Sequence, residues 1–566
     1  MNIKINGKIC VARDGETVLD VATREGIKIP TLCYLKKVGA TSNCRMCLVE
    51  VKGQRGLVTA CSYKVFDGME IRTETKEIVS ARKMNLELLL SNHDYNCTQC
   101  VRDGNCELQA LKKEYGADEK RFGGEKTLSH VDDSSPAIVR DNSKCILCKK
   151  CVAVCKNIQA VDAIKESKRG FKTEVVCAFN GELGSSSCVG CGQCVLVCPT
   201  GALRESSEIT KVENFLADDD LVKVVAPAPA VRTVLNEIMN FTKRQDAVKL
   251  LPSVFRAMGF DKVFDVNFGA DLTIMEESDE FLKRVKSGEN LPMFTSCCPA
   301  WVEYVTKFHP EIRKNLSTCK SPMMMLGAVI KTYYAEKLNV DPRKIVVVAV
   351  MPCTAKKKEA EQLNQQNLRD IDAVLSVREF AYLLNKKKIN FKSLVPSEYD
   401  SLLGESSGAS VIFGASGGVM EAALRTLADT LSGKDNLQIE YQSLRGEDSV
   451  KLARVSVAGQ KFNVAVVSGL KNVDNLIEKI KSGEIKLDFV EVMSCPGGCV
   501  NGGGMPIKES CVQNYSAIVE PRMKEIYTID QNSAIRKSHQ NKEVQEFRTW
   551  NKITHKTILH INYDKT

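Results

Sequence analysis

The sequence has few histidines, few tryptophans and no long apolar run. Only six histidines and two tryptophans occur in 566 residues. No apolar stretch reaches the length of about 20 residues that a membrane-spanning helix needs, and the first residues, MNIKINGKIC, lack the basic-then-apolar pattern of a secretion signal. These absences predict a cytoplasmic protein that does not bind a membrane.

Two further absences concern partners. No loop of the G-x-G-x-x-G type occurs, which argues against direct binding of a nicotinamide nucleotide. The net charge of +9 is small for this length. We interpret most of the lysines in the basic runs at 356–358 and 386–388 as solvated faces of helices and loops, and we expect no binding of nucleic acid.

Cysteine is abundant, with 24 residues, of which seventeen precede residue 200. In a secreted chain they would indicate disulfides, but without a secretion signal, and at intervals of two and three residues, they indicate thiolate ligands for metal. The low number of histidines favours iron-sulfur clusters. Zinc stays the alternative for any single Cys-x-x-Cys pair.

The chain length and the cysteine spacing predict several domains, with a multidomain α+β and α/β fold. Residues 1–77 alternate short apolar runs with glycine turns, as in a small mixed sheet, and residues 77–90 have a helical pattern. We place cluster-binding modules at 1–77, 78–126 and 127–208, and a catalytic domain at 209–566. In that domain the apolar runs at 222–230, 344–353, 409–418, 462–470 and 489–498 predict parallel strands covered by helices.

Three groups of ligands are expected before residue 200. The first has a central Cys-x-x-Cys and a distant outer pair, resembling a plant-type 2Fe-2S ferredoxin, with a longer first gap than usual. The second fits either zinc or a 4Fe-4S cluster, and its position between two stronger motifs favours the cluster. The groups are Cys33, Cys44, Cys47 and Cys61, followed by His93, Cys97, Cys100 and Cys106.

The third group contains two copies of C-x2-C-x2-C-x3-C, the pattern of bacterial ferredoxins with two 4Fe-4S clusters. In that pattern the fourth cysteine of each copy binds the cluster of the other copy. Cys155 should therefore join the second trio, and Cys198 the first. The copies are Cys145, Cys148, Cys151 and Cys155, and Cys188, Cys191, Cys194 and Cys198.

Three later segments, TSCCPAW at 295–301, MPCTAKKKE at 351–359 and FVEVMSCPGGC at 489–499, resemble the three signature motifs of the iron-iron hydrogenases. The resemblance covers the whole chain, including the cluster modules of the longer clostridial-type members. It implies two α/β lobes around an active-site cluster, in which a 4Fe-4S unit is joined through Cys499 to a two-iron subsite carrying CO, CN and a bridging azadithiolate. The implied ligands of the 4Fe-4S unit are Cys298, Cys353, Cys495 and Cys499.

The resemblance also implies residues that surround the cluster. Lys356 would hydrogen-bond a cyanide, and the pocket would be lined by Met351, Met493, Phe413, Pro229 and Ala230. For any single methionine, ordinary core packing fits equally well.

Cys297 is the implied proton donor, and a thiol with an unshifted pKa near about 8.5 gives and takes protons near neutrality. The implied relay continues through Glu277, Ser317 and Glu280 towards Arg284. Glu277 and Glu280 are three residues apart, on one face of a helix. Taken without the resemblance, they are more simply interpreted as exposed charges.

Several positions depart from the family pattern. Met505, Met323 and Met324 stand where polar residues are usual, so polar contacts near the cluster are lost, and Ala300 stands where glycine is frequent. Ala230 offers no hydroxyl to a cyanide. Four cysteines have no assigned role and are interpreted as buried thiols: Cys10, Cys177, Cys319 and Cys511.

The expected activity is reversible formation of hydrogen from protons and electrons. The expected partners are a ferredoxin or similar small carrier and the maturation enzymes of the two-iron subsite. An alternative is an electron-transfer subunit of an NAD-linked hydrogenase or dehydrogenase complex, which need not keep the three late motifs. A second alternative is a hydrogen sensor or a cluster-assembly relative, which generally lacks the thiol at the position of Cys297.

Overall fold

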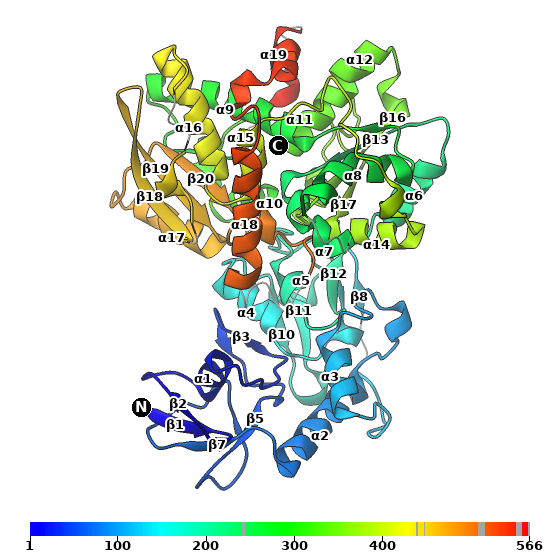
Figure 1. The fold of residues 1–566 in the computed structure, drawn as a ribbon, viewed down its shortest axis with the longest axis vertical. Helices are drawn as coiled ribbons and strands as arrows, with labels where there is room; N and C mark the ends of the chain where they lie inside the picture. Colours follow the sequence, from blue (N-terminus) through cyan, green and yellow to red (C-terminus); the bar gives the residue numbers. More distant parts are fainter. Residues whose placement is uncertain are drawn as a thin grey trace. The chain divides into compact units, whose positions relative to one another are not determined.

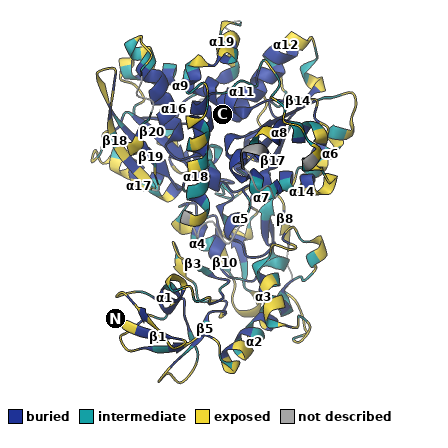
Figure 2. Cartoon of the chain, viewed as in Figure 1, coloured by how far each residue is buried: buried dark blue, intermediate teal, exposed yellow. Residues whose placement is uncertain are grey.

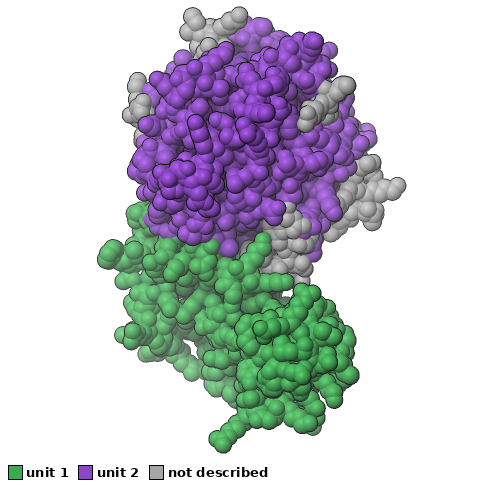
Figure 3. Space-filling model, turned by 90° about the vertical axis from the view of Figure 1, so that its left-hand side faces the viewer, with its two compact units in different colours: residues 1–157, 162–186, 197–204 green, residues 158–161, 187–196, 205–566 purple. Residues whose placement is uncertain are grey.

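The structure, a computed structural model, describes residues 1–127, 130–239, 244–436, 440–446, 448–507, 515–550 and 557–563. The chain forms two compact units, shown in separate colours in Figure 3. Unit 1 consists of residues 1–157, 162–186 and 197–204, and unit 2 of residues 158–161, 187–196 and 205–566. Figure 1 labels the helices and strands. Among the described residues, no helix is both long and apolar enough to cross a bilayer.

Unit 1 begins with a five-stranded sheet in the order β2-β1-β7-β5-β6. Strand β1 pairs antiparallel with β2 and parallel with β7, so the sheet is mixed, as the sequence predicts. Burial alternates along β1, which places one face of the sheet on a small core. The strands are β1 (Asn2–Ile5), β2 (Lys8–Val11), β5 (Leu48–Val51), β6 (Val58–Thr59) and β7 (Glu70–Arg72), accompanied by α1 (Val18–Arg24) and the pair β3 (Tyr34–Leu35) and β4 (Gly39–Ala40).

The helix expected at 77–90 is α2 (Lys76–Asn92), which begins after the N-cap residue Thr75. Its Leu86 and Leu90 pack with Leu108 and Leu111 of α3 (Glu107–Tyr115) in a core that also contains cluster-motif cysteines. The elements that follow are β8 (Val131–Asp132), β9 (Ile138–Asp141), α4 (Lys150–Asn157), β10 (Ile164–Ser167), β11 (Glu174–Cys177), α5 (Gln193–Val197) and β12 (Leu203–Glu205).

The first sheet of unit 2 has four parallel strands in the order β14-β13-β16-β17. All seven residues of β16 are buried, because helices cover both faces of the sheet, and Figure 2 shows this core in dark blue. The strands are β13 (Val222–Pro227), β14 (Lys262–Val263), β16 (Ile345–Met351) and β17 (Ala373–Ser376). The helices near this sheet in the chain are α6 (Ile209–Ala217), α7 (Leu235–Met239), α8 (Arg244–Met258), α12 (Ala335–Leu338), α13 (Ala355–Glu359) and α14 (Val377–Lys387).

The second sheet of unit 2 has the order β15-β20-β19-β18 and its own core. Its inner pairs are parallel, whereas β18 joins antiparallel to β19 at the edge. The two cores form the two lobes implied by the resemblance. The strands are β15 (Met293–Phe294), β18 (Val450–Val457), β19 (Gln460–Ser468) and β20 (Phe489–Met493), and the remaining helices are α9 (Val266–Ser287), α10 (Pro299–Phe308), α11 (Pro322–Val329), α15 (Gly408–Val411), α16 (Gly418–Ser432), α17 (Leu470–Lys481), α18 (Tyr515–Gln531) and α19 (Lys542–Thr549).

One predicted strand is wrong. The run at 409–418 forms the short helix α15 and a 3₁₀ turn rather than a strand. Ser407 caps this helix by accepting a hydrogen bond from the backbone N–H of Ser410, and it is itself held by Asp271. A short apolar run is compatible with a buried helix as well as with a buried strand, so the sequence pattern alone did not distinguish them.

Candidate active site

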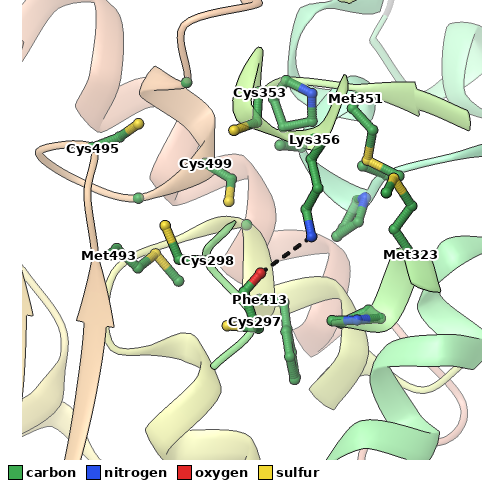
Figure 4. A pocket seen from close by; sticks show the side chains of 18 of the residues that line it. Cys297, Cys298, Met323, Met351, Cys353, Lys356, Phe413, Met493, Cys495 and Cys499 are labelled. Carbon is green, nitrogen blue, oxygen red and sulfur yellow. Dashed lines mark hydrogen bonds between the residues drawn. The ribbon is translucent and has the colours of Figure 1, made fainter. Parts of the chain in front are cut away.

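A pocket in unit 2 lies where loops leave both sheets (Figure 4). About 780 Å³ of space in this pocket and its opening to solvent is not filled by protein atoms. The lining includes the expected Pro229, Ala230, Met351, Phe413, Met493 and Lys356, and five cysteines, Cys297, Cys298, Cys353, Cys495 and Cys499.

The four cysteines expected as ligands reach the pocket from separate parts of the chain. Cys353 and Cys495 lie just beyond the carboxyl ends of β16 and β20, where open parallel sheets usually place ligands. Cys298 is the N-cap residue of α10, and Cys499 begins a 3₁₀ turn. Figure 4 shows their sulfur atoms facing a common space.

A glycine lets the Cys499 loop pass close to a neighbouring loop. Gly498 has φ of 96°, and a Cβ atom there would lie 2.7 Å from the backbone nitrogen of Ser416. A larger residue would meet backbone and would adopt a strained conformation. The approach of Cys499 to the pocket therefore depends on this glycine.

The thiols of the pocket suit a metal centre. Burial raises the pKa of Cys353 and of Cys499 to about 12, and neighbouring thiols add to the effect. Burial also raises the pKa of Cys495 well above its usual value. Coordination to iron favours the thiolate and offsets the cost of burying its charge. Four convergent thiols in an apolar pocket thus fit an iron-sulfur unit.

Lys356 extends into the same pocket. Its Nζ donates hydrogen bonds to the carbonyl of Cys297 at 3.2 Å and to Glu359 at 2.7 Å. Burial disfavours its charge, but Glu359 outweighs that effect, so the pKa of Lys356 is raised. Four of the six lysines in the two basic runs are exposed, as interpreted from the sequence. Lys356 and Lys357 are the buried exceptions, and Lys357 pairs with Glu379 at 2.8 Å.

The methionines that depart from the family pattern differ in position. Met323 lines the pocket, but Met324 and Met505 do not and are buried in the core of the first lobe. The expected loss of polar contacts beside the cluster therefore applies to Met323. Ala300 is buried in the first turn of α10 and does not line the pocket.

The expected relay residues lie close together along α9. Glu277, Glu280 and Arg284 share a face of this helix. The Ser317 hydroxyl donates to Glu280 Oε2 at 3.1 Å, and Arg284 donates to Glu280 Oε1 at 2.5 Å. These contacts form a hydrogen-bonded group at the outer end of the expected path.

Glu277 is buried, so the interpretation of this residue as an exposed charge is wrong. Neither of its carboxyl oxygens has a hydrogen-bond partner among the described residues. Burial raises its pKa to about 8, although the nearby Ser317 hydroxyl opposes the increase. Glu277 is thus suited to accept and release a proton near neutral pH.

The Cys297 thiol has a shifted pKa, contrary to the unshifted value expected from the sequence. Burial, followed by the charges of Glu277 and Cys298, raises the pKa of Cys297 well above its usual value, and Lys356 only partly opposes this effect. At neutral pH the side chain is a protonated thiol. Burial disfavours the thiolate that remains when this proton is given up, so Cys297 must be reprotonated promptly after each donation.

Three residues of this region were not identified from the sequence. Glu359 pairs with Lys356 and stands three residues after it, a spacing that could have indicated the pair. Thr318 donates from its backbone and hydroxyl to Glu280. His560 contacts Thr318 from the far end of the chain, and no sequence spacing indicated that contact.

The segment 187–196, which carries three ferredoxin-motif cysteines, packs against the pocket loops within unit 2. Thr354 Oγ1 donates to the Gly190 carbonyl at 2.7 Å, and Gln193 donates to the Asn501 carbonyl at 2.9 Å. Cys191 is close enough to Cys495 for their charges to interact. A cluster held by this segment would lie beside the pocket.

The first ligand group is assembled in unit 1. Cys33 and Cys44 are in contact, with a backbone N–H of Cys44 pointing at the Cys33 sulfur at 3.5 Å. The Cys44 thiol lowers the pKa of Cys33 to about 5, and the Cys47 thiol lowers that of Cys61 to about 7. All four sulfurs are therefore arranged as two adjacent pairs in a buried site.

The second group is assembled in part. Cys100 and Cys106 are close enough for their charges to interact, and burial raises the pKa of Cys106. His93 is buried, its Nδ1 has no hydrogen-bond partner among the described residues, and burial lowers its pKa to about 4. A neutral imidazole with an available nitrogen suits a metal ligand.

The third group includes a pocket in unit 1 lined by the first trio and Cys198. The fourth cysteine of the second copy thus lies with the first three of the first copy, as the ferredoxin pattern predicts. The trio consists of Cys145, Cys148 and Cys151. Cys155 belongs to unit 1, and Cys188, Cys191 and Cys194 belong to unit 2.

Of the unassigned cysteines, Cys10, Cys177 and Cys319 are buried and form no disulfide. Cys177 lies 3.9 Å from a guanidinium nitrogen of Arg140. Cys319 lies beside Glu280 and His560. Cys511 lies outside the described residues.

Family comparisons agree with this arrangement. Residues 222–503 match the model of the iron only hydrogenase large subunit, C-terminal domain, and residues 516–565 that of the iron hydrogenase small subunit. Residues 1–76 match a 2Fe-2S iron-sulfur cluster binding domain, and residues 144–202 a 4Fe-4S dicluster domain. Residues 82–121 match the NADH-ubiquinone oxidoreductase-G iron-sulfur binding region.

Similar proteins cover almost the whole chain. The NADP-reducing hydrogenase subunit HndD of Solidesulfovibrio fructosivorans is 40% identical over 96% of this chain and 95% of its own length. Iron hydrogenase 1 of Clostridium pasteurianum is 39% identical over 95% of this chain and 94% of its own length. A solved [FeFe]-hydrogenase structure, HydA(deltaEFG), is 36% identical with a TM-score of 0.56, covering 63% of this chain and 99% of that one. The chain therefore belongs to the iron-iron hydrogenases, oxidoreductases of protons and hydrogen that carry iron-sulfur clusters and an active-site iron cluster.

Proposed function

We propose that this chain catalyses the reversible reduction of two protons by two electrons to hydrogen, with ferredoxin as its electron partner. The observation that carries the proposal is the convergence of four thiols on one apolar pocket, with a fifth thiol, Cys297, beside them. Metal-binding thiols alone serve electron transfer. A protonated thiol next to them adds the second reactant that hydrogen formation needs.

In this proposal, Cys298, Cys353, Cys495 and Cys499 hold the 4Fe-4S unit of the active-site cluster, and Cys499 also joins the two-iron subsite. When bound, that subsite with its CO, CN and azadithiolate ligands supplies the low-valent iron at which hydrogen is made or split. Three accessory 4Fe-4S clusters and one 2Fe-2S cluster occupy the ligand groups before residue 200. The count of four relay clusters rests on those spacings.

The surrounding residues orient the cluster and exclude water. Lys356 is charged and points into the pocket, where it would hydrogen-bond a cyanide ligand. Met351, Met493 and Phe413 make the walls apolar, and Pro229 and Ala230 contribute backbone and small side chains. A dry pocket strengthens the remaining electrostatic contacts.

Protons would travel through this chain's own side chains. The Cys297 thiol donates a proton towards the cluster and is reprotonated by Glu277, whose pKa of about 8 allows it to carry a proton at neutral pH. Ser317 bonds to Glu280, which in turn pairs with Arg284.

Ferredoxin suits the expected potential and charge. The reduction potential of the proton/hydrogen couple falls by about 59 mV per pH unit, which gives about −410 mV at pH 7. This is close to the potential of plant-type ferredoxins, roughly −400 mV. The net charge of +9 favours an acidic carrier. Assembly of the two-iron subsite would require maturation enzymes.

A second candidate is transfer of electrons to NADP within a larger assembly. It is favoured by one observation, the 40% identity to a protein named an NADP-reducing hydrogenase subunit over 95% of its length. The sequence has no G-x-G-x-x-G loop, so a partner subunit would have to bind the nucleotide.

An anaerobic assay distinguishes the candidates. The matured chain is incubated with reduced ferredoxin, and separately with hydrogen and oxidised ferredoxin or NADP. We expect hydrogen from the first mixture, reduced ferredoxin from the second, and no NADPH from the chain alone. Absence of turnover with ferredoxin in either direction would instead support the second candidate, in which electrons pass to a partner subunit that binds the nucleotide.

A further inference from the structure

A cluster of three metal-ligand side chains lies at the outer end of α9. The Cys319 sulfur is 3.9 Å from Glu280 Oε2 and 4.0 Å from His560 Nδ1, and the three ligand atoms all lie within 4.8 Å of one another. Cys319 is buried, and the other two are partly exposed, so the cluster is accessible from one side. It contains none of the cysteines assigned above to iron.

Backbone pairing fixes the histidine in this position. Residues 559–561 run antiparallel to residues 318–320, with hydrogen bonds from Lys320 N to the Leu559 carbonyl and from Ile561 N to the Thr318 carbonyl. Two stretches that are far apart in sequence therefore hold Cys319 and His560 opposite each other. Such rigid support is a requirement for a defined metal geometry.

The spacing matches a zinc-type ion. Zinc–sulfur bonds of about 2.3 Å and zinc–nitrogen or zinc–oxygen bonds of about 2.0–2.1 Å put tetrahedral ligand atoms about 3.3–3.6 Å apart. The two separations from the sulfur, 3.9 and 4.0 Å, need a closure of a few tenths of an ångström, and the third pair of ligand atoms lies within 4.8 Å. Thr318 Oγ1 lies 3.1 Å from Glu280 Oε2 and 2.8 Å from His560 Nδ1, so the space between these two ligands is polar.

An outer layer of charges supports the ligands. His560 Nε2 lies 3.5 Å from Glu276 Oε2, and Arg548 holds the other oxygen of Glu276 at 3.0 Å. An ion at Nδ1 would replace the 2.8 Å hydrogen bond between Nδ1 and Thr318 Oγ1, and Glu276 beside Nε2 would then hold the ring proton on the far nitrogen. Arg284 holds Glu280 in a similar way, at 2.5 Å.

We propose that Glu280, Cys319 and His560 form a binding site for a divalent metal ion of the zinc class, and that occupation of this site stops turnover. The second part rests on the proposed function, because Glu280 belongs to the proton relay described there. On binding, the Cys319 thiol releases its proton to solvent and its sulfur coordinates the ion. The Glu280 carboxylate then coordinates the ion instead of exchanging protons with Ser317.

The consequence is inhibition without damage to the active site. Hydrogen formation and uptake use the same relay, so both directions slow together. The ligands of the iron clusters are not involved, so the infrared bands of the two-iron subsite stay in place. Removal of the ion by a chelator restores turnover.

The test uses matured holoenzyme with one equivalent of zinc. Zinc-edge X-ray absorption should show one sulfur at about 2.3 Å and nitrogen or oxygen ligands at about 2.0–2.1 Å. Competition with a chromophoric chelator should show affinity losses of about 100-fold in Cys319→Ser and in His560→Asn. The matched controls Cys10→Ser and His539→Asn alter a buried thiol and a histidine elsewhere, and they should keep the wild-type affinity.

Turnover is measured for each protein with and without zinc and is compared with its own zinc-free rate. We expect inhibition of at least about tenfold in the wild type and in both controls, and none in Cys319→Ser or His560→Asn. Zinc without a sulfur ligand, or unchanged affinity in both site variants, would overturn the metal site while leaving the hydrogenase proposal intact. Sulfur-bound zinc without inhibition would overturn the blocking step and argue against Glu280 as a proton carrier. Absence of hydrogen turnover from zinc-free enzyme would contradict the proposed function alone.

Discussion

Cys297 and Cys298 are neighbours in the sequence, but their sulfur atoms point in different directions in Figure 4. Cys298 faces the other three expected ligands, whereas Cys297 is influenced most by burial and then by Glu277. A single peptide unit thus separates the proposed metal ligand from the proposed proton donor. A resemblance that includes both cysteines therefore points to hydrogen chemistry, because one is the expected cluster ligand and the other the expected proton donor.

The first prediction concerns Cys297→Ala. This variant should keep the active-site cluster, because Cys297 is not among the four expected ligands, and it should lose nearly all turnover because no thiol donates the proton. Infrared spectra and hydrogen assays on the same sample measure both properties. Cys10→Ala, which removes a buried thiol in the first domain, serves as the control and should keep its activity. Full activity in Cys297→Ala would place the relay elsewhere.

The second prediction concerns Glu277→Gln. In the folded wild type the carboxyl has a pKa of about 8, compared with about 4.3 for an unfolded glutamate. The folded state therefore binds an extra proton between these values, and the free energy of unfolding falls as pH rises through this window. From pH 6 to pH 8 the wild type should lose on the order of 1–3 kcal/mol relative to the glutamine variant.

The measurement is the pH dependence of the thermal unfolding midpoint of both proteins under anaerobic conditions. Glu289→Gln, at an exposed glutamate, is the matched control and should follow the wild type. Parallel curves for wild type and Glu277→Gln would contradict the raised pKa. The variant should also turn over hydrogen at a small fraction of the wild-type rate, because an amide does not relay protons.

Among the secondary-structure elements, the strands whose carboxyl ends carry the pocket cysteines were largely predictable from the sequence. Strands β13, β16 and β20 lie within apolar runs identified from the sequence, β19 overlaps the run at 462–470, and Cys353 and Cys495 follow two of these strands as expected. Continuous apolar runs predict buried strands because both faces of the sheet are covered. The run at 409–418 failed because its helix is set by Ser407 and Asp271, a contact between segments far apart in sequence.

Contacts between distant elements explain the other limits. The burial of Glu277 and Lys357 follows from packing against other helices and strands, and a charged residue in a sequence gives no sign of that. The pairing of residues 559–561 with 318–320 is set by tertiary structure. Ligand spacings, by contrast, are local, so the cluster motifs were visible in the sequence.

The third prediction concerns the contact between the segment 187–196 and the pocket loops. A Cβ atom on Gly503 would lie 2.5 Å from Gly192 Cα and from the Cys191 carbonyl, so Gly503→Ala must push these backbones apart. Overpacking of this kind costs about 1–3 kcal/mol. The apparent unfolding midpoint should fall, and ferredoxin-driven turnover should fall with it.

Gly123→Ala is the control for this substitution, because a Cβ atom there meets no atom within 4 Å. It should leave both the midpoint and the turnover at wild-type values. An unchanged Gly503→Ala protein would show that the close approach of the two loops is not needed.

At the scale of the whole molecule, the cysteines are divided by task. Seventeen precede residue 200, and fifteen of these are grouped in cluster motifs, whereas the last 366 residues contain seven, of which five line the pocket. This distribution agrees with the proposed division into an electron path in the first part and a reaction site in the second. The division also predicts that loss of the two-iron subsite leaves the relay clusters in place.

The fourth prediction is the iron content. Fully matured chain should contain about 20 iron atoms, from one 2Fe-2S cluster, four 4Fe-4S units and one two-iron subsite. Chain produced without the maturation enzymes should contain about two fewer and should be inactive. Iron analysis of both preparations, normalised to protein by amino-acid analysis, checks the count. A difference much larger than two would mean that maturation also affects the relay clusters.

Infrared spectroscopy of matured wild-type chain tests the central claim most directly, with Cys499→Ser as the comparison. We expect carbonyl and cyanide stretching bands in the wild type and their loss in Cys499→Ser, because that thiolate is proposed to join the two-iron subsite to the 4Fe-4S unit. Absence of these bands from fully matured wild-type protein would contradict the assignment of the pocket as the site of hydrogen chemistry.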